Sequence, residues 1–288
     1  MTRFSLSVAL VTRNRPEHLQ RCLDSLMGQA VQPKEILISD DSDESEAHRN
    51  ELTAKRADVR YLRGPRRGLY ANRNHSILAC KGSHIRTMDD DHEFPNGHIA
   101  ACISAIEMDP HAIWIIGEFY PNEERTNTAA PICPGQLHPR GFSRPPENPQ
   151  DCWAISDGAT IYPRVVFDRG FRYAEDFRFG ASYLEFGSLL HSQGFRIRHL
   201  VDTYIIHHYD PKRRSFMDKD TDLSSRLFAM LCHSFIHAPF IRNKALTLFQ
   251  LLREATVGQS GTLHSLYKGM IAARKRAAYT KSLPFHHV

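Results

Sequence analysis

The segment "SVALVTRNRPEHLQRCLDSLMGQAVQPKEILISDD" (residues 7–41) decides the fold that we expect for this chain. It opens with a short apolar run, passes through a polar turn, continues as a helix-like segment that begins at Pro16, and ends in a second apolar run. Proline suits the first turn of a helix, where its missing N–H is not needed. The apolar residues of the helix-like segment recur as they would on one helical face: Leu19, Cys22, Leu23 and Leu26. Strand, helix and strand in this order predict a parallel βαβ unit.

The same alternation continues to about residue 120. Strand-like runs are predicted at 4–12, 35–41, 58–64, 83–88 and 112–120, with helical segments between them. Strands that alternate with helices of this length predict an α/β fold. We expect a mainly parallel central sheet flanked by helices on both faces and joined by right-handed crossovers.

The second half of the chain is less regular. Residues 121–151 hold seven of the 16 prolines, which indicates a functional loop or a lid. Three more strands are predicted, at 154–163, 195–200 and 203–209, and the pattern after them is helical. We therefore divide the chain into an α/β half over 1–120, a second half over 121–215 and a C-terminal helical extension over 216–288.

The composition is that of an ordinary globular protein, with 24% charged and 41% apolar residues in 288. The net charge of +5 suits an anionic ligand or an anionic membrane surface, but it is too small for a nucleic-acid binder. Six scattered cysteines without a C-x-x-C pair indicate a reducing, cytoplasmic setting. We recognise neither a signal peptide nor an apolar membrane span, and expect a cytoplasmic protein that is soluble or at most peripheral.

Polar residues cluster where the predicted strands end. The three clusters are Thr12-Arg13-Asn14, Asp40-Asp41-Ser42 and Asp89-Asp90-Asp91. In an open parallel sheet the carboxyl ends of the strands meet at one edge, and ligands bind in the crevice there. The clusters therefore predict a single ligand site at that edge.

The three aspartates predict a metal site. Side chains alternate along an extended chain, so Asp89 and Asp91 face one side and Asp90 the other. Two carboxylates at the end of a strand suit a hard divalent cation that keeps positions for substrate phosphates. The alternative is a solvated acidic turn that ends at Pro95 and Gly97. We favour the metal site because the other polar clusters fall at the same edge.

These features resemble glycosyltransferase family 2. Residues 7–45 are similar to the opening of that family, in which a strand, a T-x-N-R-like turn and a helix lead to a strand ending in Asp-Asp. The block "GLYANRNHSILACKGSHIRTMDDDHEFP" (68–95) is similar to the family's next block, which ends in the D-x-D motif. The resemblance covers roughly residues 5–210 and is most specific in the first hundred.

The resemblance implies a Rossmann-like GT-A fold and an enzyme that transfers a sugar from a UDP or dTDP donor to an acceptor hydroxyl. It further implies an inverting displacement assisted by Mn²⁺ or Mg²⁺, a Lewis acid that neutralises charge on the departing diphosphate. The implied metal ligands are Asp89 and Asp91. The implied substrate-binding residues are Thr12, Arg13, Asp40 or Asp41, and Arg73, to which we add Asp90 as a candidate.

The second half supplies candidates for the general base and the acceptor contacts. An inverting transfer needs a base that takes the acceptor's proton, and the family carries a carboxylate at the start of a helix before a G-F-R-I strand. Glu185 matches that position best, followed by Asp176 and Glu175, but Glu185 lies only nine residues before Gly194, about one helical turn short. The remaining candidates are Trp153 and Asp157 for the acceptor, and His207, preferred over His208, for the metal.

Other functions fit part of the pattern: a non-catalytic nucleotide-sugar-binding protein, a metal-dependent phosphohydrolase and a nucleotidyltransferase. The expected acceptor is a carbohydrate, a lipid-linked molecule or a small molecule, and not a nucleic acid. We expect the C-terminal helices to cover the sheet, because their apolar positions are needed to anchor them. A homodimer contact, or peripheral contact with an anionic membrane at its inner face, are the alternatives.

Overall fold

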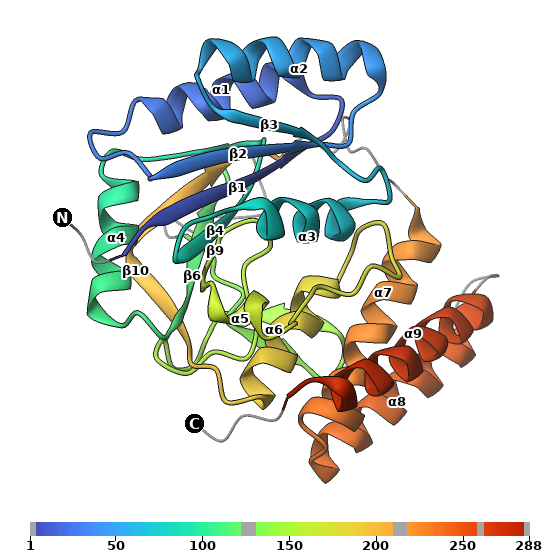
Figure 1. Cartoon of the computed structure of the whole chain (residues 1–288). Helices are drawn as coiled ribbons and strands as arrows, with labels where there is room; N and C mark the ends of the chain where they lie inside the picture. Colours follow the sequence, from blue (N-terminus) through green and yellow to red (C-terminus); the bar gives the residue numbers. More distant parts are fainter. Residues whose placement is uncertain (1–3, 122–130, 210–217, 258–261, 285–288) are drawn as a thin grey trace.

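The computed structural model describes residues 4–121, 131–209, 218–257 and 262–284. Its centre is an eight-stranded sheet with helices on both faces (Figure 1). In sheet order the strands are β3 (Arg60–Arg63), β2 (Glu35–Asp40), β1 (Leu6–Thr12), β4 (His84–Asp89), β9 (Thr160–Pro163), β6 (Ile113–Phe119), β10 (Ile197–His207) and β5 (His92–Glu93). Neighbours pair in parallel except around β9 and at β5, so the expected mainly parallel sheet is confirmed.

Two helical layers bury the two faces of this sheet. Because side chains alternate along a strand, Val8 and Leu10 pack on one face and Ala9 on the other. The first face is covered by α1 (Pro16–Met27), α2 (Glu44–Arg56) and α4 (His98–Met108). The second is covered by α3 (Leu69–Ala79), α5 (Val165–Asp168) and α6 (Ser182–Ser192). The apolar face predicted for α1 is confirmed, since all four of its residues are buried.

The strand predictions of the second half were wrong in two places. Only Thr160–Pro163 of the run at 154–163 is a strand, because Gly158 has a φ of +69° and Thr160 Oγ1 donates a hydrogen bond of 2.8 Å back to the carbonyl of Ser156. The two strands predicted at 195–200 and 203–209 are one strand, β10, which continues through a register shift between Leu200 and Tyr204.

The proline-rich segment 121–151 contains a short hairpin. Its strands are β7 (Gln136–His138) and β8 (Phe142–Arg144), and Gly141 between them has a φ of +83°. Residues 122–130 of the predicted loop lie outside the described residues. The hairpin stands beside the main sheet and contributes side chains to the cavity described below.

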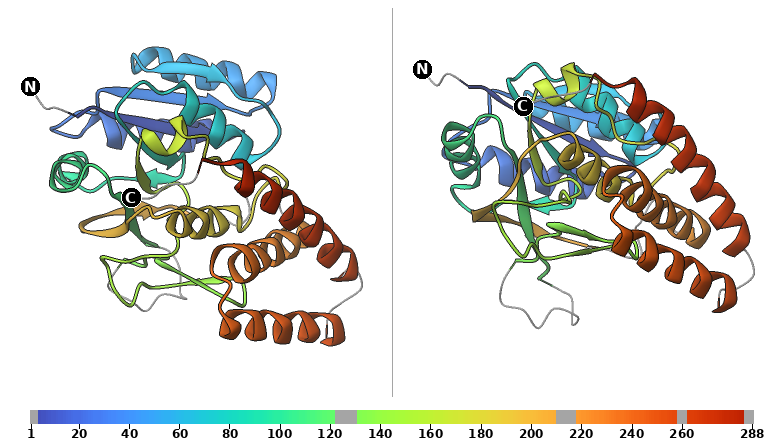
Figure 2. Two further views of the ribbon diagram at one scale, coloured as in Figure 1. Left: turned by 60° about the horizontal axis from the view of Figure 1, so that its bottom comes forward. Right: turned by 90° about the horizontal axis from the view of Figure 1, so that it is seen from below.

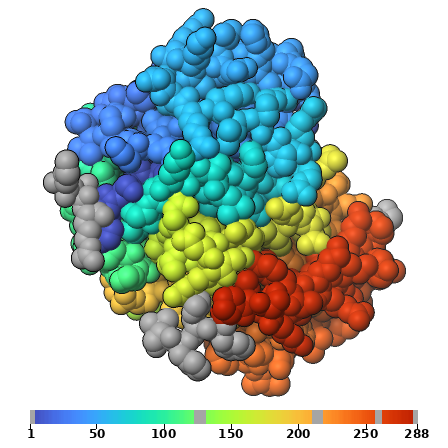
Figure 3. All heavy atoms as spheres, viewed as in Figure 1, coloured from blue at the N-terminus to red at the C-terminus, as the bar shows by residue number. Residues whose placement is uncertain are grey.

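The C-terminal helices form a group at the end of the molecule away from α1 and α2 (Figures 1 and 2). They are α7 (Lys219–Cys232), a π-helical turn η2 (His233–His237), α8 (Ile241–Val257) and α9 (Thr262–Ser282). Small residues on α9 let it pack closely on α7: a Cβ added at Gly269 would lie 3.1 Å from the Cβ of Leu227. Figure 3 shows α9 at the molecular surface. Within the described part of the chain, no helix has the length and apolar character needed to span a membrane.

Candidate active site at the carboxyl edge of the sheet

A cavity of about 570 Å³ lies where the strands end. The sheet contributes residues at or just beyond the carboxyl ends of five strands: Thr12, Arg13, Asp41, Asp89, Asp91, Glu118 and His207. The hairpin and the C-terminal half supply the opposite wall, with Phe142, Tyr183, Asp222 and Arg226. The polar clusters that the sequence places at separate strand ends are therefore brought to one cavity.

Asp90 points away from the cavity, as strand alternation predicts. Its carboxylate accepts a hydrogen bond of 2.6 Å from Thr12 Oγ1 and forms an ion pair with Arg15. Burial raises the pKa of Asp90 to about 7, although Arg15 opposes the shift. Nη1 of Arg15 also donates to Asp91 Oδ2 at 2.9 Å, so one guanidinium joins the two carboxylates.

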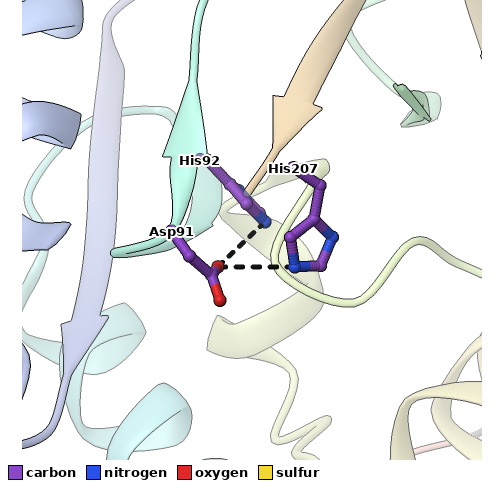
Figure 4. A group of neighbouring side chains, drawn as sticks. All are labelled: Asp91, His92 and His207. Atoms are coloured by element: carbon purple, nitrogen blue, oxygen red, sulfur yellow. Dashed lines mark ion pairs between the residues drawn. The ribbon is translucent and has the colours of Figure 1, made fainter. Parts of the chain in front are cut away.

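Asp91, His92 and His207 point toward one another (Figure 4). Nε2 of His207 lies 3.5 Å from Asp91 Oδ1, and its Nδ1 lies 2.9 Å from Glu118 Oε2. Burial alone would lower the pKa of His207, but the carboxylates of Asp91 and Glu118 outweigh it and raise that pKa well above its usual value. His208 turns elsewhere and pairs with Glu93 at 2.7 Å.

The donor atoms of this group fit a divalent cation. One carboxylate oxygen and two imidazole nitrogens lie within 4.8 Å of one another. Neither ring nitrogen of the buried His92 makes a hydrogen bond to any described residue, and such unsatisfied buried groups are uncommon. Mixed oxygen and imidazole ligands suit manganese-like ions. Asp91 and His207 can thus hold a metal, and His92 is a further ligand candidate that the sequence did not suggest.

Asp89 has a different partner. The buried guanidinium of Arg73 places its Nη2 3.0 Å from Asp89 Oδ1 and 2.8 Å from Asp157 Oδ1. The hydroxyl of Tyr70 adds a hydrogen bond of 3.2 Å to Asp157. Burial raises the pKa of Asp157 to about 7, against the effect of Arg73. Two carboxylates therefore share one buried cation at this wall of the cavity.

The two acidic residues at the end of β2, Asp40 and Asp41, have different surroundings. Asp40 is fully buried and accepts hydrogen bonds from the Ser42 backbone, Asn50 and Tyr61, so it holds the local backbone together. Asp41 lines the cavity and accepts a hydrogen bond of 2.8 Å from the backbone N–H of Arg66. Of the two, Asp41 is the one placed to meet a ligand.

The best sequence candidate for the base, Glu185, is not among the cavity-lining residues. It is fully buried on α6, where it forms an ion pair with Arg276 and lies 2.7 Å from His237 Nε2. Burial alone would raise the pKa of Glu185, but the charge of Arg276 and the contact with His237 lower it below its usual value. The contacts with Arg276 and His237 therefore favour the ionised form of Glu185 and fix the position of its carboxylate.

Six other candidates also lie outside the cavity lining: Asp40, Asp90 and Arg73, whose buried contacts are given above, and Asp176, Glu175 and Trp153. Asp176 pairs with Lys275 at 3.0 Å, and Glu175 pairs with Arg67 at 2.9 Å. The ring of Trp153 stacks on the imidazole of His191, with 3.6 Å between the ring centroids. The structure therefore brings Asp157 to the cavity but not these six side chains.

Sequence reasoning missed several cavity residues. Glu118 lies near the end of β6, so the strand-end argument that selected the aspartates also applies to it. Arg15 lies just beyond the first polar cluster and was passed over. Asp222 and Tyr183 come from α7 and α6, and only the tertiary fold brings these helices to the sheet edge.

Solved structures share this fold. TarS 1–349 of S. aureus, in complex with UDP-GlcNAc, is 15% identical with a TM-score of 0.67, over 96% of this chain and 83% of that one. A longer TarS structure gives a TM-score of 0.63 at 15% identity over 96% of this chain, which spans 50% of that one. GalNAc-T7 with UDP, GalNAc and Mn²⁺ gives 0.67 at 14% identity, over 98% of this chain and 59% of that one.

At these identities the likeness concerns the fold, and it confirms the GT-A arrangement expected from the sequence. Among curated proteins, none matches the chain. The model of the family described as glycosyl transferase family 2 matches residues 7–171, which is more than half of the chain and includes β1, β2, β4 and the aspartates. By this match the chain belongs to glycosyl transferase family 2.

Proposed function

We propose that this chain transfers a sugar from a nucleoside-diphosphate donor of the UDP or dTDP type to an acceptor hydroxyl. The observation that carries the proposal is the convergence of five strand ends, with their carboxylates and cations, on one cavity of about 570 Å³. A cavity of that size suits a small-molecule ligand. Family membership supports sugar transfer, and the similar TarS and GalNAc-T7 structures contain UDP-GlcNAc and UDP.

The nucleoside and the diphosphate of the donor would each meet complementary groups in the cavity. Asp41, Thr12 and Arg13 line the cavity, and we propose that they contact the base or the ribose. Arg15, whose guanidinium pairs with Asp91, would offer positive charge to the diphosphate. A Mn²⁺ or Mg²⁺ ion held by Asp91 and His207, with Asp89 and His92 close by, would neutralise charge on the leaving diphosphate.

The acceptor's proton requires a carboxylate that reaches the cavity. Glu185, Asp176 and Glu175 each have partners away from it, whereas Asp157 lines it. A pKa of about 7 suits a proton acceptor at neutral pH. We therefore propose Asp157 as the base of an inverting transfer to a carbohydrate, lipid-linked or small-molecule hydroxyl.

Thermal denaturation with UDP and dTDP, each with and without Mn²⁺, tests the binding half of the proposal. We expect one nucleotide to raise the melting temperature only when Mn²⁺ is present, because a ligand that binds the folded state stabilises it. Asp91→Asn should abolish this shift, and the exposed Asp202→Asn should retain it. A shift that does not need metal, or none with either nucleotide, would contradict the proposed donor site.

Turnover separates the rival functions. Release of UDP from a UDP-sugar only with an acceptor indicates transfer, whereas nucleotide binding without release under any condition indicates a non-catalytic binder. Release of inorganic phosphate indicates a phosphohydrolase, and synthesis of a UDP-sugar from UTP and a sugar phosphate indicates a nucleotidyltransferase. Asp157→Asn should abolish transfer while Mn²⁺-dependent UDP binding persists. Asp222 is another carboxylate that lines the cavity, so Asp222→Asn is the matched comparison. If Asp222→Asn loses transfer and Asp157→Asn does not, the base is Asp222.

A further inference from the structure

Helix α8 is turned with its apolar side outward. Its inward residues Asn243, Thr247 and Gln250 are polar and buried. The amide of Asn243 donates 3.0 Å to the carbonyl of Ala238, Thr247 Oγ1 donates 2.7 Å to Ser234 Oγ, and Gln250 Oε1 accepts from Arg140 at 2.8 Å. The outward residues are Ile241, Leu248, Phe249 and Leu252, with exposed fractions of 83%, 51%, 61% and 66%. The hydrogen bonds of the inner face therefore fix α8 in an orientation that leaves its apolar face in solvent.

Helix α9 repeats this pattern over its first half. Its inward residues Ser265, Gly269 and Ala272 are small and pack on α7. Leu263, Tyr267 and Met270 face outward, each more than half exposed. From the sequence, we expect the apolar residues of the C-terminal helices to be buried where these helices pack against the rest of the fold. For these residues that expectation was wrong, because polar and small side chains make the anchoring contacts instead.

The charge of the two helices is strongly one-sided. Together α8 and α9 carry eight basic residues and a single acidic one, Glu254. Three of the basic side chains are hindered from contacting a binding partner at the surface. Arg276 is buried against Glu185, Lys275 pairs with Asp176, and Lys244 is half-buried. The five exposed ones are Arg242, Arg253, Lys268, Arg274 and Lys281. Helices α8 and α9 contact each other (Figure 2). Exposed apolar and basic side chains thus occur together on two neighbouring helices.

We propose that α8 and α9 form a docking surface for an anionic lipid bilayer. Phe249, Leu252 and Tyr267 would enter the boundary between headgroups and acyl chains, and the basic side chains would meet anionic headgroups. A second copy of the chain fits this surface less well, because a symmetric contact would bring two basic faces together without acidic partners. The inference does not rest on the proposed activity, since a chain that binds no nucleotide would still bind such a bilayer.

Co-sedimentation of the full chain with lipid vesicles tests this surface. We expect binding to vesicles that contain phosphatidylglycerol, little binding to pure phosphatidylcholine, and weakening as salt is raised. The double variant Phe249→Ser with Leu252→Ser should weaken binding roughly tenfold or more, because two anchoring side chains are lost. Arg253→Gln and Lys268→Gln should each weaken it about fivefold.

Matched controls come from exposed residues on other elements. Met108→Ser with Val201→Ser removes two side chains that are 70% and 65% exposed, and should leave vesicle binding unchanged. Lys55→Gln with Arg56→Gln on α2 controls for charge in the same way. Far-UV circular dichroism checks that each variant folds. Absence of binding to anionic vesicles, or equal loss in the controls, overturns the proposal. Dimerisation through this surface would also overturn the proposal. In that case the molar mass of the unaltered chain would double as its concentration is raised, whereas the Phe249→Ser, Leu252→Ser variant would stay monomeric.

Discussion

Glu185 and Arg276 form a buried ion pair that ties α9 to α6 across 91 residues of chain. Nε of Arg276 donates to Glu185 Oε1 and its Nη2 lies next to Oε2, both at 2.8 Å, so the guanidinium grips the carboxylate with two nitrogens. The same Nη2 donates 2.9 Å to the carbonyl of Arg172. This pair attaches the C-terminal helices to the sheet domain, which gives Glu185 a structural role away from the cavity.

Glu185→Gln should therefore lower stability more than turnover. Removing one charge of a buried pair leaves the other uncompensated, which costs about 3 kcal/mol or more. We expect a melting temperature lower by several degrees, with sugar transfer per folded molecule close to that of the unaltered chain. The exposed Glu107→Gln is the control and should change neither quantity. A Glu185→Gln variant with an unchanged melting temperature and no transfer would instead restore Glu185 as the base.

The same pair predicts how stability depends on pH. The pKa of Glu185 in the folded chain is below its usual value, so the unfolded chain binds the proton more tightly. The stabilisation is then fully present above the unfolded pKa of about 4.3 and is lost as pH falls through the folded value. In urea denaturation at pH 7, 5 and below 4, the difference in unfolding free energy between the unaltered chain and Glu185→Gln should shrink only at the lowest pH. A difference that stays constant would contradict the assignment.

Local sequence patterns accounted for most of the first half of the fold. The apolar face of α1 and the strand-like runs before Thr12, Asp40 and Asp89 carry enough periodicity to place each element. The position of β9 between β4 and β6 is different, because its direction and neighbours depend on contacts with strands far away in the chain. Likewise, β10 continues through an irregularity at 200–204 that looks like a break in the pattern.

The residues of the site also differ in whether a local sequence pattern or the packing of distant segments places them. Thr12, Asp91 and His207 were identified because each follows or ends a strand, and the carboxyl ends of parallel strands share an edge. The partner of Glu185 is Arg276, and a pairing at that distance in sequence leaves no mark on the local pattern around either residue. Side chains that depend on the packing of distant helices can be placed only from the three-dimensional structure.

Gly158 should be needed to keep Asp89 in place. A Cβ added there would lie 2.7 Å from Asp89 Cγ, and the φ of +69° disfavours any other residue. Gly97 offers a matched control, since its φ is +81° but a Cβ would meet nothing within 4 Å. We expect both alanine variants to lose about 1 kcal/mol from backbone strain. Only Gly158→Ala should also weaken the Mn²⁺-dependent thermal shift by UDP, and equal shifts in the two variants would show that Asp89 can move without consequence.

We expect the positive charge of Arg73 to matter more for stability and transfer than the planar shape of its guanidinium group. A single nitrogen of its side chain contacts both Asp89 and Asp157, so the amine of a lysine can replace part of the interaction. Arg73→Met removes the buried cation and should destabilise the fold by about 3 kcal/mol or more. It should also suppress transfer at neutral pH, because without the cation the two carboxylates favour sharing a proton.

Arg73→Lys should recover part of both losses, and raising the pH should restore transfer further in Arg73→Met than in the lysine variant. Chemical denaturation reports the stability of the two variants, and transfer rates measured from pH 6 to pH 9 report the ionisation of the carboxylates. A lysine variant as inactive as the methionine variant at every pH, with its stability recovered, would mean that the planar shape of the guanidinium, and not its charge, sets the geometry of Asp157.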